Sequence, residues 1–220
     1  MRLDLHVHST HSRDGTASPK DIVRRCRQLG MSGLAITDHN AIAGSLAAHA
    51  LGRAEGLLVV TGVEVSSSEG HVLAYGVTEL IPRGLTAAET VERIGAAGGV
   101  AVAAHPRRFP SGVGLGIAEQ VRFDAVEVLN GGSSAMANRA ALRLARGMGR
   151  SQTGGSDAHR LCEVGRSYTD VEGAFTEDQV LEAIRKGLSR PGGRSRTVRE
   201  GAAYSVETLV EWLRGGMDRL

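Results

Sequence analysis

The sequence is poor in aromatic residues, cysteine and lysine. Phe, Trp and Tyr make up 3% of its 220 residues, so the stacking surfaces that single-stranded nucleic acid favours are scarce. Its two cysteines, Cys26 and Cys162, lie far apart without metal-binding spacing, which favours free thiols in a reducing compartment over a disulfide. Lys20 and Lys186 are the only lysines among 26 basic residues. Arginine supplies the rest, and its planar fork suits bidentate contacts to phosphate.

Long apolar runs and a strong net charge are also missing. No run approaches the length of a membrane-spanning helix, and the chain enters an apolar strand at residues 3–8 without the hydrophobic region of a signal peptide. We therefore expect a cytoplasmic protein with no membrane partner. The formal net charge of +2 does not indicate a broad nucleic-acid coat. A hydrophobic content of 41% over this length predicts one domain, residues 1–220, with residues 190–220 packing on its main body.

Short apolar runs alternate with helical patterns, which is typical of βα units around a parallel sheet. We expect strands at residues 3–8, 34–37, 57–63, 72–77, 100–104, 125–129 and 151–153. Helices are expected at residues 18–29, 41–54, 86–97, 134–148, from 176 onward, and at 206–214. Residues 107–116 and 190–199 are expected to be irregular or exposed loops.

The first strand carries the pattern His6-Val7-His8, with Asp14 in the loop that follows. Side chains alternate along an extended strand, so the two imidazoles point the same way and can reach one metal ion. Further histidines and carboxylates lie in or beside later strands, most of them at the carboxyl ends, which share one face in a barrel of parallel strands. The nine candidate ligands, all nitrogen or oxygen donors, are His6, His8, Asp14, His39, Glu64, His71, His105, Asp157 and His159.

Taken in order, the segments that carry these candidate ligands resemble the polymerase and histidinol phosphatase (PHP) family. The resemblance covers most of the chain and implies a distorted seven-stranded (β/α) barrel of TIM-like type. It also implies two or three divalent ions, zinc, manganese or iron, at the barrel mouth. The matching segments are His6-x-His8 with Asp14-Gly15, Thr37-Asp38-His39, Gly62-Val63-Glu64, His71 before residues 72–76, Ala104-His105-Pro106, and Gly155-Ser156-Asp157-Ala158-His159.

The resemblance also implies how the ligands are shared. The first ion would take His6, His8, Glu64 and Asp157. The second would take Glu64 as a bridge, with His71 and His105. The third would take Asp14, His39 and His159.

The same resemblance implies a metal-dependent phosphoesterase that attacks a phosphate monoester or diester of a small metabolite or nucleotide with a metal-activated hydroxide. Asp157 and His159 are its catalytic candidates within the ligand set, and either His159 or a water would protonate the leaving group. Arg107 and Arg108, and after them Arg166, are candidates for neutralising the phosphoryl oxygens. Each arginine is equally able to be a surface charge.

Several residues keep two interpretations. Asp38 either caps the next helix or orients an imidazole, and Glu127, in an otherwise apolar strand, either pairs with an arginine or lies close to the metals. We expect His11 and His49 at the surface.

Three other functions remain open. The arginine-rich residues 190–199 suggest a 3'-5' exonuclease or oligonucleotide phosphatase that follows a phosphate backbone. Some relatives of this fold act as non-catalytic binding modules in nucleic-acid assemblies, although no ligand position here is apolar. Hydrolysis of a carbon–nitrogen bond is the third, because the family resembles the amidohydrolases in architecture. It is disfavoured, since the amidohydrolase pattern usually includes a metal-bridging lysine and neither lysine here lies at a strand end.

Overall fold

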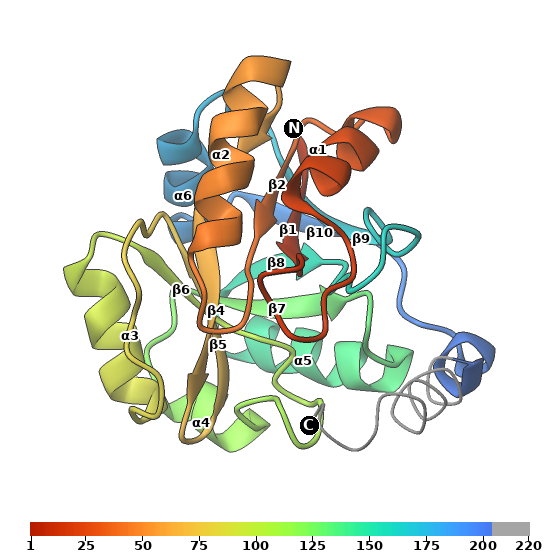
Figure 1. The fold of residues 1–220 in the computed structure, drawn as a ribbon. Helices are drawn as coiled ribbons and strands as arrows, with labels where there is room; N and C mark the ends of the chain where they lie inside the picture. Colours follow the sequence, from red (N-terminus) through yellow and green to blue (C-terminus); the bar gives the residue numbers. More distant parts are fainter. Residues whose placement is uncertain (204–220) are drawn as a thin grey trace.

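Two mixed β-sheets form the centre of the fold in the computed structural model, which describes residues 1–203 (Figure 1). The first sheet has the strand order β10-β9-β1-β2-β3 and the second has the order β4-β5-β6-β7-β8. The strands are β1 (Arg2–Val7), β2 (Gly33–Ile36), β3 (Leu58–Val59), β4 (Gly62–Ser67), β5 (Gly70–Tyr75), β6 (Val100–Ala103), β7 (Ala125–Asn130), β8 (Ser151–Gly155), β9 (Ser167–Val171) and β10 (Ser189–Gly193).

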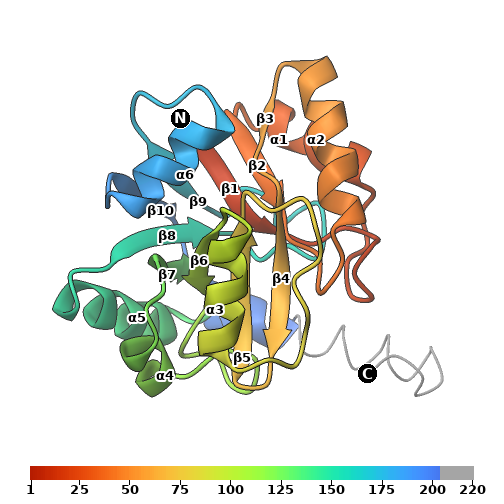
Figure 2. The ribbon, with the colours of Figure 1, turned by 90° about the vertical axis from the view of Figure 1, so that its left-hand side faces the viewer.

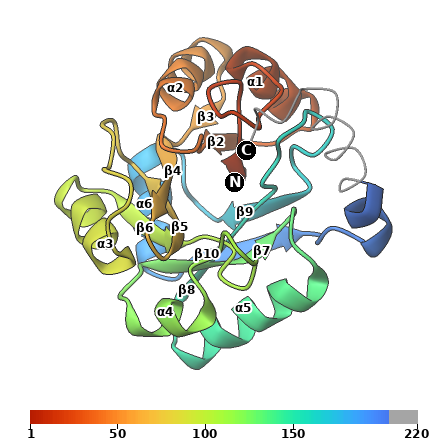
Figure 3. The same ribbon diagram turned by 60° about the horizontal axis from the view of Figure 1, so that its bottom comes forward.

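Helices surround both sheets (Figure 3). The first two pack beside β2 and β3, the third beside β5 and β6, and the fifth beside β7. Figure 2 shows the sixth helix near the amino terminus and the third in front of β5 and β6. The bounds are α1 (Pro19–Gln28), α2 (Ala43–Glu55), α3 (Ala87–Ala96), α4 (Leu115–Gln120), α5 (Ala135–Gly147) and α6 (Glu177–Arg185). No helix within residues 1–203 is both long and apolar enough to cross a membrane.

Local signals account for most helix starts. Ser18 accepts a hydrogen bond from the Asp21 backbone, with Pro19 as the first helical residue. Thr86 and Thr176 each open a helix with a complete capping box, as their sequences predict. The first helix then buries its apolar face, with Ile22, Val23 and Cys26, against the first sheet.

The two sheets meet on both sides of their shared interior. After β8, the backbone N–H of Asp157 donates to the carbonyl of His6 at 2.7 Å, and that of His8 donates to Ala158 at 2.8 Å. After β2, the backbone of His39 forms an isolated bridge with Glu64 of β4. Within residues 1–203 the strands nevertheless form two sheets and no continuous barrel. The α/β class is confirmed, and the closed TIM-like barrel is not.

Strand directions and boundaries differ from the expected parallel pattern. The pairs β4–β5, β5–β6, β1–β9 and β9–β10 are antiparallel. The predicted single strand at residues 57–63 is wrong, because the ladder breaks between β3 and β4. There the backbone N–H of Thr61 donates to Glu177 of α6 at 2.7 Å instead of to a neighbouring strand. Glu64 consequently lies inside β4 and not at a strand end.

Two predicted loops contain regular structure. Residues 107–116 include the start of α4 at Leu115. Residues 190–199 are not wholly an exposed loop, because β10 pairs with β9 from Ser189 to Gly193. The Ser, Pro and Gly composition of β10 hides this strand from a propensity argument, since backbone hydrogen bonds to β9 stabilise it. The helix expected at residues 206–214 falls outside the described residues.

Candidate metal centre

Six histidine rings converge where the two sheets meet. The centroids of five of them form a closed circuit around Glu64: His6–His8 5.2 Å, His8–His39 4.6 Å, His39–His71 4.8 Å, His71–His105 5.6 Å and His105–His6 5.6 Å. The His159 ring stacks on that of His8 at 4.4 Å. The structure thus brings all nine predicted ligand side chains into four overlapping groups with metal-binding spacing.

The first group joins β1 to the residues that follow β8 and to β4. His6 Nε2 lies 3.4 Å from both Glu64 Oε2 and Asp157 Oδ1, and His8 Nε2 lies 3.3 Å from the same two oxygens. Ligands held about 2.0–2.2 Å from a tetrahedral ion lie about 3.3–3.6 Å from one another. The four atoms therefore have the spacing of a coordination shell.

Hydrogen bonding supports the same interpretation. His6 Nε2, His8 Nε2 and Glu64 Oε2 are buried and lack a hydrogen-bond partner. A buried polar atom without a partner costs roughly 1–3 kcal/mol, and a cation at this position would satisfy all three. The donor set fits a divalent metal ion.

The second group gathers on the other oxygen of Glu64. Its Oε1 lies 3.0 Å from His71 Nδ1 and 3.0 Å from His105 Nε2. His39 Nδ1 approaches Oε2 at 3.1 Å. Glu64 therefore contacts five histidines, and its two oxygens face different ones, which suits a carboxylate that bridges two ions.

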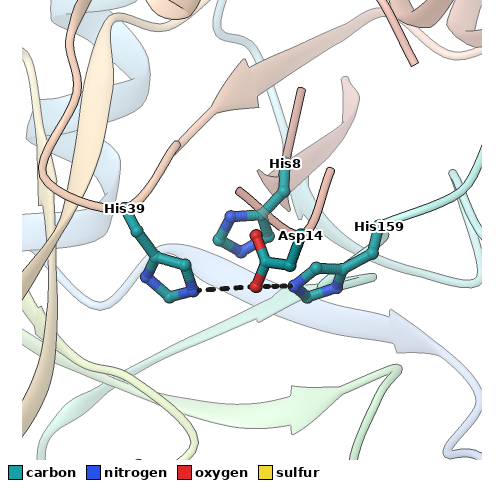
Figure 4. A group of neighbouring side chains, drawn as sticks. All are labelled: His8, Asp14, His39 and His159. Carbon is teal, nitrogen blue, oxygen red and sulfur yellow. Dashed lines mark hydrogen bonds and ion pairs between the residues drawn. The ribbon is translucent and has the colours of Figure 1, made fainter. Parts of the chain in front are cut away.

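The third group lies nearest the solvent and is drawn in Figure 4. Asp14 Oδ2 lies 3.0 Å from His159 Nε2 and 3.4 Å from His39 Nε2. His8 lies within reach of the same group, so it borders the first and third groups at once. The Asp14 side chain is 45% exposed, which leaves this side of the centre open to a substrate.

Burial and charge pull the pKa values of the centre in opposite directions. Burial alone would raise the pKa of Glu64, yet the histidines around it, led by His6, hold that pKa well below its usual value. Burial alone would lower the pKa of His39, but Glu64 and Asp14 raise it to about 9. Glu64 therefore keeps its charge, and without a cation His39 retains its proton at neutral pH.

The backbone is strained where ligands are presented. Among residues 1–203, three residues other than glycine have a positive φ: Asn40 at 51°, His105 at 28° and Asp157 at 52°. Two are predicted ligands and the third follows His39. Such strain of about 1–3 kcal/mol per residue is typical of functional sites, where the surrounding structure holds it in place.

Small polar residues hold the loops around the centre. The hydroxyl of Ser12 accepts the backbone N–H of His39 at 2.8 Å and lies 3.3 Å from His8 Nδ1. Within residues 1–203 neither interpretation of Asp38 holds: the cap of α2 is Ile42, and the Asp38 carboxylate accepts the backbone N–H and the hydroxyl of Ser9 at 2.6 and 2.7 Å. Ser9 in turn contacts His11. Serine is too common in loops for its sequence position to reveal this role.

Two family models match this chain. The PHP domain model covers residues 4–108 and the PHP-associated model covers residues 135–188. The chain belongs to the PHP family. The membership predicted from the sequence is therefore confirmed.

Curated proteins similar to this PHP domain differ in their described functions. An uncharacterised protein of Methanocaldococcus jannaschii is 35% identical over 116 residues, which cover 48% of this chain and 68% of that protein. A phosphoribosyl 1,2-cyclic phosphate 1,2-diphosphodiesterase of Eggerthella lenta is 41% identical over 37% of this chain and 33% of its own length. A 5'-3' exoribonuclease of Haemophilus influenzae is 42% identical over 37% of this chain and 31% of its own. The chain thus spans about a third of the length of these two named enzymes.

Solved structures share the fold of this PHP domain. A two-domain protein of Bacteroides vulgatus, described as containing a predicted PHP-like metal-dependent phosphoesterase, superposes with a TM-score of 0.72 at 17% identity. The match covers 88% of this chain and 65% of that protein. At this identity the likeness concerns the fold alone.

The predicted arginines occupy different positions in this PHP domain. Arg108 forms an ion pair with Asp157, whereas the side chain of Arg107 is exposed. Arg166 is mostly buried; its Nη1 donates to the carbonyl of Gly131 at 3.3 Å and faces Glu163 at 3.5 Å. Arg108 alone of the three has a described contact with a predicted ligand.

The predictions of two surface histidines and two free thiols are confirmed in part. His11 is exposed, but His49 is half-buried and lies 3.7 Å from Glu177, away from the centre. Both cysteines are free thiols, Cys26 buried and Cys162 exposed. Burial raises the pKa of the Cys26 thiol, so it remains protonated.

Proposed function

We propose that this PHP domain hydrolyses a phosphate monoester or diester of a small metabolite or a nucleotide. The observation that carries this proposal is the set of buried, unpartnered nitrogen and oxygen atoms that face one another at 3.3–3.4 Å around Glu64 and Asp157. The centre suits two or three divalent ions. Imidazole and carboxylate donors without thiolate accept zinc, manganese or iron.

We assign the nine side chains to three ions. His6, His8, Glu64 and Asp157 would hold one ion. Glu64, His71 and His105 would hold a second, and His39 together with Asp14 and His159 would hold a third. Bound divalent ions supply Lewis acidity and a water with a pKa near 7, which is the chemistry that phosphoester hydrolysis needs at neutral pH.

Residues of the chain itself orient the substrate. Arg108 lies against Asp157, where its guanidinium would neutralise a non-bridging phosphoryl oxygen in the transition state. Arg107 is exposed and would at most attract an anionic substrate. Of the two roles open to His159, the contacts favour ligation: its Nδ1 lies 3.0 Å from the carbonyl oxygen of Asp157, leaving Nε2 toward Asp14.

The space beside Arg108 favours a small substrate. A hollow of about 220 Å³ adjoins the loop after β6, below the roughly 300–1,000 Å³ of clefts that enclose drug-sized ligands. Its lining residues are Pro106, Arg107, Arg108, Phe109, Gly112, Gly114 and Leu115. A leaving group the size of a sugar or a nucleobase would fill it.

A nuclease activity is the second candidate, because a similar curated protein is named an exoribonuclease. Two contacts argue against a phosphate-tracking role for residues 190–199. Arg194 pairs with Glu200 at 2.7 Å, and Arg196 pairs with Glu163 at 3.1 Å, so both charges are already compensated. Turnover on oligonucleotides that falls steeply with salt would support the nuclease.

Elemental analysis combined with a phosphatase assay tests the proposal. The substrates are an aryl phosphate and a panel of nucleoside monophosphates, and the variants are His8→Ala and Asp157→Ala. His49→Ala is the matched control, because His49 lies outside the centre. We expect two or three ions per chain and phosphate release that disappears only in the two site variants. A protein that binds no ion, shows no turnover after reconstitution and binds RNA would be a non-catalytic module instead.

A further inference from the structure

Glu127 is a buried carboxylate that lies behind the proposed ligands and outside the ligand set. It projects from β7 and is 1% exposed. Its Oε1 lies 2.9 Å from His6 Nδ1, and its Oε2 accepts the backbone N–H of His105 at 2.9 Å. A single side chain thus contacts two of the residues proposed to hold metal.

The contact with His6 determines which ring nitrogen is free. An ionised carboxylate accepts hydrogen bonds and donates none, so His6 Nδ1 carries the proton of this bond. In the neutral ring, the lone pair is then on Nε2, the buried atom without a partner that faces Glu64 and Asp157. Only this tautomer of His6 is able to bind an ion at that position.

Asn130 connects Glu127 to a second proposed ligand. Its amide nitrogen lies 3.0 Å from Glu127 Oε2 and 3.3 Å from Asp157 Oδ2. The amide oxygen accepts the backbone N–H of Gly132 at 2.9 Å, which sets the direction of the NH₂ group. Asn138 holds the backbone of Asn130 on both sides, accepting its N–H at 3.1 Å and donating to its carbonyl at 2.9 Å.

We propose that Glu127 and Asn130 are positioning residues for the ion held by His6 and Asp157. Glu127 selects the His6 tautomer. Asn130 holds Glu127 and directs Asp157 so that Oδ1 faces the first ligand group. This inference rests on the proposed metal centre, and it concerns metal affinity and geometry more than the identity of the substrate.

The variant Glu127→Gln tests the tautomer. If its amide oxygen keeps the bonds to His105 and Asn130, its NH₂ faces His6 Nδ1, which must then accept. The ring proton moves to Nε2 and blocks coordination. Loss of such an outer partner typically weakens metal binding about 10–100-fold, and we expect a change in this range for Zn²⁺, measured by competition with a chromophoric chelator.

A second readout separates positioning from general stability. In protein loaded with Co²⁺, the visible spectrum reports ligand geometry, and we expect it to change in Glu127→Gln and in Asn130→Ser. Thermal unfolding of the metal-free variants reports whether each one folds. If Glu127→Gln does not fold, the Zn²⁺ affinity and Co²⁺ spectrum of Asn130→Ser decide the question. The double variant should lose less affinity than the two single losses combined, since both act on one network.

Glu177→Gln is the matched control. Glu177 also accepts a backbone N–H, that of Thr61 at 2.7 Å, and also faces a histidine, His49 at 3.7 Å, but it is remote from the centre. We expect unchanged Zn²⁺ affinity and an unchanged Co²⁺ spectrum. Folded Glu127→Gln and Asn130→Ser proteins that bind metal like the control would overturn the inference. Failure of the unaltered protein to bind any metal would instead overturn the proposed function.

Discussion

Arg108 forms an ion pair with Asp157, and so links the loop after β6 to the segment that follows β8. The guanidinium is the largest favourable influence that keeps the pKa of Asp157 below its usual value, against a burial effect in the opposite direction. The neighbouring Arg107 is exposed. Two adjacent arginines that look equivalent in the sequence thus have different surroundings.

This difference predicts unequal effects of substitution. Removing one donor that stabilises transition-state charge costs about 10²–10³ in turnover, so we expect Arg108→Ala to lower kcat about 100-fold. Arg107→Ala should change kcat by less than about threefold, since its side chain has no described contact with the centre. Steady-state kinetics on the best substrate of the phosphatase panel measures both. Equal losses in the two variants would show that Arg108 has no special role.

Glu64 should control the metal content of the whole centre. Its carboxylate contacts five histidines, which are His6, His8, His39, His71 and His105. We expect Glu64→Gln to retain at most one ion per chain, because an amide has one acceptor oxygen where the carboxylate has two. Elemental analysis after dialysis measures this. Exposed Glu69→Gln is the control, and a Glu64 variant with the full ion complement would refute a bridging role.

Metal binding should release protons and strengthen as the pH rises. Without a cation the pKa of His39 is raised to about 9 by Glu64 and Asp14 despite burial, and an imidazole must lose its proton to bind an ion. Zn²⁺ affinity should therefore increase between about pH 6.5 and 9. Calorimetry in buffers with different ionisation enthalpies counts the protons released. An affinity independent of pH across this range would contradict the assignment.

The same shift gives the metal-free protein an opposite dependence on pH. His39 has a higher pKa folded than unfolded, so its favourable contribution is complete below about pH 6.5 and lost as the pH rises through about 9. Thermal unfolding of metal-free protein at several pH values measures this loss. Phe or Gln in place of His39 should flatten the curve over that window.

Gly155 permits the close approach of β8 to β1. A methyl group on it would lie 2.4 Å from His6 Cβ and 2.7 Å from His6 N, so one strand must move. We expect Gly155→Ala to lower the free energy of unfolding by about 1–3 kcal/mol and to weaken metal binding through His6. Gly147→Ala is the control, because nothing lies within 4 Å of its added methyl group and alanine favours helices. Denaturant unfolding compares the two; similar stability would argue against the tight contact.

Much of the candidate centre follows from short-range rules. The alternation of side chains along β1 predicts that His6 and His8 share a face, and the apolar runs before His39 and His105 predict that strands deliver them to one place. Capping boxes at Thr86 and Thr176 predict two helix starts. These features depend on residues a few positions apart, so they can be predicted from the sequence alone.

Contacts between distant segments required the tertiary structure. The partners of Glu127 are His6, 121 residues away, and the backbone of His105, and nothing near Glu127 in the chain indicates them. The order of strands in the sheets, the antiparallel β9 and β10, and the division of β3 from β4 depend in the same way on remote partners such as Glu177.

The sequence by itself determined the types of candidate ligand, the family of the chain and the α/β class. Only the tertiary structure decided that Arg108 and not Arg107 contacts Asp157, that Glu64 lies at the centre of five histidines, and that Glu127 lies behind His6. The physical reason is that residue type and local spacing restrict which chemistry is possible, whereas distances between side chains are set by packing two sheets against each other.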